Sequence, residues 1–305
     1  MPDSPRPLEG RTAIVTGAGR GIGRATALAL ASRGASVVVN DLGASLDGTS
    51  TESGTAGAVV AEIEAAGGRA VANGDSVSEW PSAQRIAECA LDHFGQIDFL
   101  VNNAGLSSVA PIWEIDVEDF DRVVRSHLHG TFHCMRAATP HMKERGVGRV
   151  VNLVSRAGLI GVAANGAYGA GKGGVFALTN VAARDLEPFG VTVNAVNPAA
   201  TETRMVTTAI EKFRKEGGAA GKRAEGLVAA LQPPEQVAAL ITALCHNEAA
   251  HISGQIFYIE KGRVGLFQPL EIERDATTDG PWSIDSLLEA TASFEPYPLG
   301  AVYGG

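Results

Sequence analysis

The sequence predicts an α/β fold: a doubly wound, Rossmann-type sheet of seven parallel strands with helices on both faces, built as a single domain. Two observations carry this prediction. From Arg11 onward, short β-rich runs alternate regularly with longer helical patterns, which is typical of consecutive β–α–β units. The candidate strands are almost continuously apolar, as expected for a parallel sheet that is buried on both faces.

The predicted elements follow one another through most of the chain. Clear strand candidates cover residues 12–16, 36–40, 97–101, 149–154 and 191–196, and weaker ones cover 69–72 and 255–259. Helical patterns cover residues 22–33, 56–66, 82–94, 117–145, 168–187 and 234–247. The helix that begins at Tyr168 is expected to end near Pro188 and Gly190, because this pair of residues terminates helices.

Three segments depart from this alternation. Residues 42–57 form a Gly-, Ser- and Thr-rich loop after the second strand, and residues 204–232 are charged, rich in Ala and Gly, and placed where a lid is expected. We therefore predict one Rossmann-type domain over residues 8–262, with the lid at 204–232. Residues 263–305 are predicted to be a C-terminal extension rather than a separate domain.

Composition and charge narrow the class of protein. The formal net charge of −9 opposes a nucleic-acid-binding surface, which needs a basic field. Cys89, Cys134 and Cys245 lie far apart and are predicted to be reduced thiols, which suits the cytosol. No apolar run reaches the ~18 residues that cross a bilayer, and the N-terminus lacks the apolar core of a secretory signal. We predict a cytoplasmic protein that binds neither nucleic acid nor membrane and holds no metal.

A glycine-rich segment, Thr-Gly-Ala-Gly-Arg-Gly-Ile-Gly at residues 16–23, follows the first strand directly and opens the first helix. Glycines permit a tight turn there and let backbone amides approach a pyrophosphate, which the helix N-terminus attracts. The spacing is Gly-x-x-x-Gly-x-Gly rather than the usual dinucleotide Gly-x-Gly-x-x-Gly. The predicted cofactor contacts in this segment are Gly17, Arg20, Gly21, Ile22 and Gly23.

The second strand indicates which dinucleotide binds. Asp41 ends this strand, eighteen residues beyond Gly23. A carboxylate at this position can accept hydrogen bonds from the adenosine ribose hydroxyls and would repel a 2′-phosphate. Arg20 points the other way, since a cation in the glycine loop could pair with that phosphate. We predict that NAD is preferred over NADP, with an NADPH-dependent ketoreductase as the alternative.

Tyr168 and Lys172 are candidate catalytic residues because their spacing places them on one face of a helix. A phenol titrates near 10, and a neighbouring ammonium is expected to lower its pKa so that it can exchange protons near neutral pH. Ser155 ends the fifth strand, at the carboxyl edge of the sheet where ligands bind, and its hydroxyl could hold a substrate oxygen. This set predicts hydride transfer between a nicotinamide and a secondary alcohol or ketone.

Over residues 8–262 the chain resembles the classical short-chain dehydrogenase/reductase family. The resemblance rests on the glycine loop, Asn-Asn-Ala-Gly at 102–105, Ser155, Tyr168-x-x-x-Lys172 and Asn-Pro-x-x-x-Thr at 197–203. It implies further cofactor contacts: Asp75 and Ser76 at the adenine, Asn103, Ala104 and Gly105 along the adenosine, Pro198, Thr201 and Thr203 at the nicotinamide, and Tyr168 and Lys172 themselves. It also implies a homodimer or homotetramer.

His127 stands where the family has a catalytic Asn that holds a water leading to the lysine. We predict that His127 supports the proton path, since an imidazole titrates near 6.5; the alternative is a packed, structural histidine. This replacement, the long loop after Asp41 and Asp75-Ser76-Val77 resemble the dehydrogenase domain of peroxisomal multifunctional β-oxidation enzymes. That resemblance implies a 3-hydroxyacyl-CoA or steroid-like substrate. A nucleotide-binding redox sensor without turnover is the alternative of another class.

Overall fold

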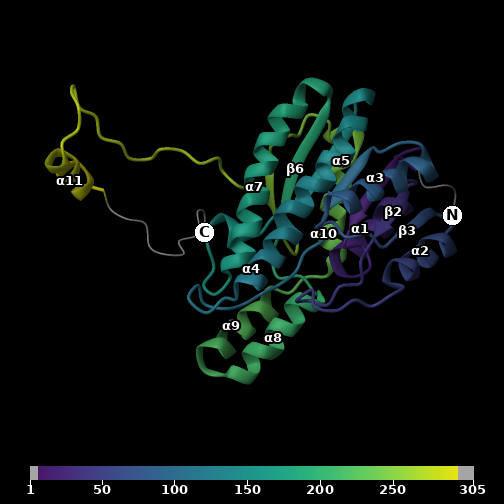
Figure 1. The fold of residues 1–305 in the computed structure, drawn as a ribbon, viewed down its shortest axis with the longest axis horizontal. Helices are drawn as coiled ribbons and strands as arrows, with labels where there is room; N and C mark the ends of the chain where they lie inside the picture. Colours follow the sequence, from purple (N-terminus) through teal and green to yellow (C-terminus); the bar gives the residue numbers. More distant parts are fainter. Residues whose placement is uncertain (1–5, 295–305) are drawn as a thin grey trace. The chain divides into compact units, whose positions relative to one another are not determined.

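The computed structural model describes residues 6–294 and contains the predicted doubly wound sheet (Figure 1). The strands are β1 (Thr12–Thr16), β2 (Ser36–Asn40), β3 (Arg69–Asn73), β4 (Phe99–Asn102), β5 (Gly148–Leu153), β6 (Val191–Pro198), β7 (Ile256–Glu260) and β8 (Arg263–Leu266). Their order in the sheet is β3-β2-β1-β4-β5-β6-β7-β8, and β1 to β7 are parallel. The predicted fold class is confirmed.

The sheet has eight strands instead of the predicted seven. Strand β8 pairs antiparallel with β7 through the two-residue turn Lys261-Gly262, in which Lys261 has a φ of +48°. Positive φ in such a turn suits the twist of a tight hairpin. The strand is only four residues long and mostly exposed, so it lacks the apolar run that identifies the other strands. It begins at Arg263, where the sequence predicted the extension to begin.

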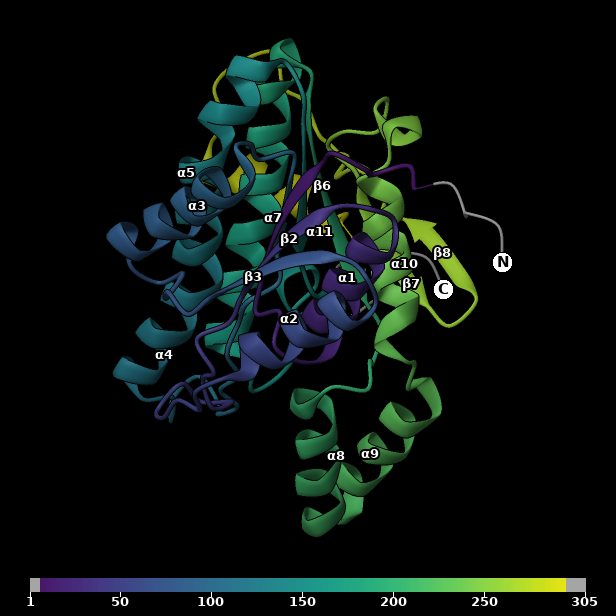
Figure 2. The same ribbon diagram turned by 90° about the vertical axis from the view of Figure 1, so that its right-hand side faces the viewer.

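Helices cover both faces of the sheet (Figure 2). The helices of the unit that contains the sheet are α1 (Gly21–Ser32), α2 (Thr55–Ala65), α3 (Trp80–Phe94), α4 (Val117–Val124), α5 (Gly130–Arg145), α6 (Arg156–Leu159), α7 (Gly166–Leu186), α8 (Arg204–Glu216), α9 (Gly218–Ala230) and α10 (Pro234–Leu244). Helix α11 (Ile284–Ala292) belongs to the C-terminal unit. Alternate strand residues enter opposite cores: Val37 and Val39 pack toward α1, α2 and α10, whereas Val38 packs toward α3, α5 and α7.

The helical pattern at 117–145 is interrupted by one π-helical turn, Arg125–His129, between α4 and α5. Single π turns inside helices occur often at functional sites, and this one contains His127. Residues 204–232 are mainly the helix pair α8 and α9, held by a small core of Ile210, Phe213 and Ala224. Both views show this pair projecting from one end of the sheet (Figures 1 and 2).

The chain divides into two compact units, Met1–Leu266 and Phe267–Gly305. Within the second unit, α11 begins with a capping box in which Ser283 and Ser286 bond each other's backbone N–H. Its Ile284, Leu287 and Leu288 side chains are exposed. Across residues 6–294, no helix combines the length and the apolar character that crossing a bilayer requires.

Candidate active site

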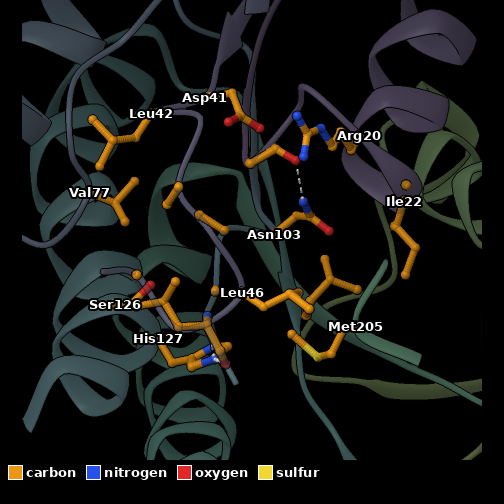
Figure 3. Close-up of a pocket in the computed structure, with 18 of the residues that line it drawn as sticks. Arg20, Ile22, Asp41, Leu42, Leu46, Val77, Asn103, Ser126, His127 and Met205 are labelled. Atoms are coloured by element: carbon orange, nitrogen blue, oxygen red, sulfur yellow. Dashed lines mark hydrogen bonds between the residues drawn. The ribbon is translucent and has the colours of Figure 1, made fainter. Parts of the chain in front are cut away.

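A pocket of about 400 Å³ opens at the carboxyl ends of the strands, where the strand order reverses between β1 and β4. Ligands of doubly wound sheets bind at this switch point. Most residues that the sequence singled out line it: Gly17, Arg20, Gly21, Ile22, Asp41, Asp75, Ser76, Asn103, Ala104, Gly105, His127, Tyr168, Lys172, Pro198 and Thr203. Figure 3 shows Asp41 and Arg20 at one end of this pocket and His127 at the other.

The glycine loop is packed so closely that side chains would not fit. Gly17 and Gly21 have φ of +62° and +53°, and a Cβ on Gly23 would lie 2.2 Å from the carbonyl oxygen of Gly17. Asn103 Nδ2 donates to the carbonyl oxygens of Thr16 (2.9 Å) and Gly17 (3.0 Å), which braces the loop against β4 (Figure 3). This cradle at the N-terminus of α1 fits the pyrophosphate of a dinucleotide.

Asp41 is held firmly at the end of β2. Its Oδ2 accepts a hydrogen bond from the Gly19 N–H (2.7 Å), and its Oδ1 accepts from the Gly43 N–H (2.7 Å) and the Thr55 hydroxyl (3.3 Å). The carboxylate therefore lies against the glycine loop, where the adenosine ribose of a dinucleotide would bind. Arg20 forms an ion pair with Glu52.

Asp75 and Ser76 lie beyond β3 and line the pocket. Asp75 accepts hydrogen bonds from Asn73 Nδ2 (2.9 Å) and Arg85 Nε (2.7 Å). Its backbone carbonyl accepts from Asn40 Nδ2 at 2.8 Å, which ties the segment after β3 to the end of β2. The Asp75 carboxylate is thus already hydrogen-bonded, and it remains part of the pocket wall.

Tyr168 and Lys172 both lie on α7, where Lys172 is buried and Tyr168 is half-buried. Lys172 is 5% exposed, and its Nζ donates to the carbonyl oxygen of Leu153 (2.5 Å) and lies 5.9 Å from the centre of the Tyr168 ring. Burial lowers the pKa of Lys172 to about 7. Burial raises the pKa of Tyr168, and a hydrogen bond with Ser155 lowers it in part. The expectation of a lowered pKa for Tyr168 is therefore wrong for the protein alone, because desolvation outweighs the hydrogen bond with Ser155.

Ser155 reaches Tyr168 because two helices approach closely. Ser155 caps the short helix α6, where its Oγ accepts from the Ala157 N–H at 3.3 Å. A Cβ on Gly158 would lie 2.4 Å from the backbone nitrogen of Gly173 on α7, so only glycine allows this contact. Ser155 is not part of the pocket wall itself, but it adjoins Tyr168, which is.

His127 is 2% exposed and lies between the end of β4 and α7. Its Nε2 lies 2.8 Å from the Leu106 carbonyl oxygen and 3.1 Å from the Leu106 nitrogen, and its ring meets that of Tyr168 edge-on at 5.0 Å. Burial, and secondarily the charge of Lys172, lowers the pKa of His127 to about 3. The expected titration near 6.5 is therefore wrong, and His127 is neutral at physiological pH.

Two predicted cofactor contacts do not line the pocket. Gly23 is buried under the glycine loop, where it permits close packing of α1. Thr201 is buried, and its hydroxyl donates to the Ala199 carbonyl oxygen (2.9 Å) and accepts from Gln232 Nε2 (3.4 Å). Thr201 therefore stabilises the turn between β6 and α8 without contacting the pocket, whereas Thr203 lines the pocket.

Several wall residues were missed by the sequence reasoning: Leu42, Leu46, Gly48, Arg122, Ser126, Arg204 and Met205. Leu42, Leu46 and Gly48 come from the loop after β2, which folds across the pocket. The Arg204 guanidinium donates to the Ala44 carbonyl (2.7 Å), and Arg122 Nε donates to the Asp47 carbonyl (2.6 Å). The unusual length of this loop is the sequence feature from which its contact with the pocket could have been predicted. Over residues 6–294, no group of three or more His, Cys, Asp and Glu side chains is arranged to hold a metal.

A nucleotide cradle, a half-buried tyrosine beside a buried lysine, and an adjoining serine on a doubly wound sheet define an oxidoreductase that uses a nicotinamide dinucleotide. Comparison with known proteins agrees, because residues 11–214 match the family model of short chain dehydrogenases. The chain belongs to the short-chain dehydrogenase/reductase family, whose members act on hydroxyl and keto groups with NAD or NADP.

Individual relatives are consistent with this assignment. The chain is 40% identical over 262 residues to peroxisomal multifunctional enzyme type 2 of Mus musculus, covering 86% of this chain and about a third (33%) of that protein. It is 36% identical to a hydroxyacyl-CoA dehydrogenase of Mycobacterium tuberculosis, covering 96% of this chain and 90% of that one. A crystal structure of a short chain dehydrogenase from Mycobacterium avium superposes with a TM-score of 0.81 at 37% identity, covering 98% and 100% of the two chains.

Proposed function

We propose that this chain is an NAD-dependent dehydrogenase that interconverts a 3-hydroxyacyl thioester and the corresponding 3-ketoacyl thioester. The observation that carries the reaction type is the Tyr168–Lys172 pair, which lines the pocket beside Ser155. The substrate class is supported by the similarity, over nearly the whole chain, to a protein named hydroxyacyl-CoA dehydrogenase. Steroid-like secondary alcohols are the second substrate class to test.

The catalytic chemistry follows from the placement of three side chains. Tyr168 in its phenolate form accepts the proton of the substrate hydroxyl and becomes a neutral phenol, while a hydride leaves the same carbon for the nicotinamide and the C–O bond becomes a carbonyl. Ser155, bonded to Tyr168, holds the substrate oxygen in line with the phenol. The ammonium of Lys172, which donates a hydrogen bond to the Leu153 carbonyl oxygen, stabilises the phenolate form of Tyr168. In the reverse direction Tyr168 donates the proton.

A nicotinamide dinucleotide supplies the hydride acceptor when it is bound. We propose that the glycine loop holds its pyrophosphate, that Asp75, Ser76 and Asn103 flank its adenosine, and that Pro198 and Thr203 flank its nicotinamide. Asp41 would accept hydrogen bonds from the ribose hydroxyls. Because the carboxylate is held by the Gly19 and Gly43 amides, it cannot turn away to admit a 2′-phosphate without losing both bonds. This supports NAD over NADP.

We propose that His127 is a neutral positioning residue. It bonds the backbone of Leu106 and packs against the Tyr168 ring, so it fixes the wall of the pocket next to the reacting phenol. Its Nδ1 is buried and has no hydrogen-bond partner among the described protein atoms, which suits a bond to water on the path to Lys172. A neutral imidazole can both accept and donate in such a path.

We propose a homodimer or homotetramer that forms through α5 and α7. Phe132 on α5 is 49% exposed and Val181 on α7 is 56% exposed, although both side chains are apolar. Val175 on the same helix is buried, so it is not part of this surface. We propose the cytosol as compartment, since the cysteines are free thiols. The peroxisome, which appears in the names of several relatives, is the alternative that cell fractionation tests.

The decisive experiment is an activity screen of the purified protein with 3-hydroxyacyl-CoAs, steroid alcohols and small secondary alcohols, each with NAD and NADP. We expect the highest kcat/KM with a 3-hydroxyacyl-CoA and NAD. Faster turnover of a ketone with NADPH would replace this proposal by the ketoreductase function. Tight nucleotide binding with no turnover of any substrate would favour a sensor and refute the assignment of Tyr168 as the catalytic acid and base.

A further inference from the structure

The cation of the glycine loop is not free to bind a phosphate. Arg20 follows Gly19, whose N–H donates to Asp41, so its side chain lies at the adenosine end of the pocket (Figure 3). A guanidinium here would be the natural ligand of the 2′-phosphate of NADP, because its paired N–H groups match phosphate oxygens. In this protein the guanidinium forms an ion pair with the Glu52 carboxylate.

Glu52 reaches this position because the chain doubles back after β2. The Glu52 N–H donates to the carbonyl oxygen of Gly43 (2.8 Å), and Ala44 and Thr51 form an antiparallel bridge. Gly43 has a φ of +74°, and a Cβ there would lie 1.8 Å from the Glu52 carbonyl oxygen. Glycine is therefore required at 43 for the returning limb of the loop to pass this close to Asp41.

The loop is anchored at three further points. Its carbonyl oxygens at Ala44, Leu46 and Asp47 accept hydrogen bonds from Arg204, the backbone N–H of Ser107, and Arg122, at 2.7, 2.9 and 2.6 Å respectively. These donors belong to three separate parts of the fold. The position of Glu52 beside the glycine loop is therefore set by the fold and does not depend on the Arg20 ion pair alone.

We propose that Glu52 is a specificity-determining residue that excludes NADP. It neutralises the one cation of the glycine loop and adds a second carboxylate to that of Asp41, so a 2′-phosphate would have to displace Glu52 from Arg20 and face two like charges. NAD carries an uncharged 2′-hydroxyl at this position, so the two carboxylates do not repel it. The inference rests on the proposed preference for NAD. It assigns part of that preference to Glu52, in addition to Asp41 at the end of β2.

The test is direct binding of NAD and NADP to Glu52→Gln, measured by isothermal titration calorimetry, because binding does not depend on knowing the substrate. We expect the Kd for NADP to fall about tenfold, as the removal of one charge close to a phosphate predicts. The Kd for NAD should stay within about twofold, since the 2′-hydroxyl of NAD is uncharged. Raising the salt concentration should reduce the gain for NADP, because Glu52 is exposed.

A matched control is available in a neighbouring Arg–Glu ion pair, which joins α1 to α2. Glu62 pairs with Arg24, one turn beyond Arg20, and neither residue lines the pocket. Glu62→Gln removes the same charge from the α2 partner of Arg24 and should leave the Kd for NADP unchanged. Arg20→Ala combined with Glu52→Gln should cancel the gain, because the freed guanidinium is what binds the phosphate.

Each other result overturns the inference. An unchanged Kd for NADP in Glu52→Gln, with NAD binding intact, would assign the preference to Asp41 alone and leave the dehydrogenase function standing. An equal gain in NADP affinity in Glu62→Gln would show that the effect comes from the net surface charge and not from Glu52 itself. A wild-type protein that binds NADP more tightly than NAD would refute both this inference and the proposed cofactor, and turnover with 3-hydroxyacyl-CoAs would then show whether the substrate proposal survives.

Discussion

Replacing Lys172 by methionine should abolish turnover and at the same time stabilise the protein below pH 7. Burial lowers the pKa of Lys172 from 10.5 to about 7, and at 1.36 kcal/mol per unit this corresponds to about 5 kcal/mol of unfavourable desolvation of the charged form. Methionine has a similar length and carries no charge. It loses the bond from Nζ to the Leu153 carbonyl oxygen, which costs about 1–3 kcal/mol when a buried acceptor is left unpaired.

The net gain in the free energy of unfolding is therefore about 2–4 kcal/mol at pH 6, where the lysine is charged in both the folded and the unfolded state. Between the folded pKa near 7 and the unfolded value of 10.5, the unfolded wild type binds one more proton than the folded protein. Wild-type stability from this group thus rises with pH by about 1.4 kcal/mol per unit. The advantage of Lys172→Met should be gone near pH 9.

The assay is thermal or urea-induced unfolding of the wild type and Lys172→Met between pH 6 and pH 9. Cys134 and Cys245, whose pKa values are raised to about 12 by burial, occur in both proteins and cancel in the difference. At pH 6 we expect a rise in Tm of roughly 5–10 °C and kcat lower by at least about a hundredfold. Lys212→Met, on the exposed face of α8, is the control and should change neither. A Lys172→Met protein less stable than wild type at pH 6, or a difference that does not vary with pH, would refute the reasoning.

The other predictions test the remaining parts of the site. Tyr168→Phe should lower kcat by about 10²–10⁴-fold and leave the Kd for NAD unchanged; more than a tenth of wild-type kcat would contradict its role as acid and base. Asp41→Ala should narrow the ratio of kcat/KM for NAD over NADP, and an unaltered ratio would show that Asp41 does not bind the ribose. His127→Leu should cost about 1–3 kcal/mol of stability and lower kcat, because the Leu106 backbone loses its hydrogen-bond partner. His127→Asn should keep most of the stability and most of the kcat of the wild type. Loss of a kinetic pKa near 6.5 in His127→Asn would contradict a neutral histidine. Val181→Asp should shift the sedimentation of the protein toward the monomer, and a wild type that is monomeric at every concentration would exclude the α5–α7 interface.

The sequence predicted the parts of the fold that depend on local periodicity. The apolar runs at β1, β2 and β5 and the residues that follow each strand are adjacent in the chain, so their positions at one edge of the sheet follow from the strand pattern alone. The course of residues 42–57 over the pocket depends on donors at Ser107, Arg122 and Arg204, which are distant in sequence. Likewise, the neutral state of His127 results from burial by the whole fold, which its place in the sequence does not reveal.

His127 packs between two segments that the sequence identified separately, Asn-Asn-Ala-Gly at 102–105 and Tyr168-x-x-x-Lys172. A Cβ on Gly105, the last residue of the Asn-Asn-Ala-Gly segment, would lie 2.0 Å from Cε1 of His127, and a Cβ on Gly171 would lie 3.0 Å from its Cβ. Glycine at both positions therefore leaves the space that an imidazole needs between β4 and α7. Since Lys172 follows Gly171 directly, the packing of His127 against Gly171 also fixes the position of Lys172 relative to β4. Enlarging either glycine should therefore displace the catalytic pair, even though neither glycine carries a functional group.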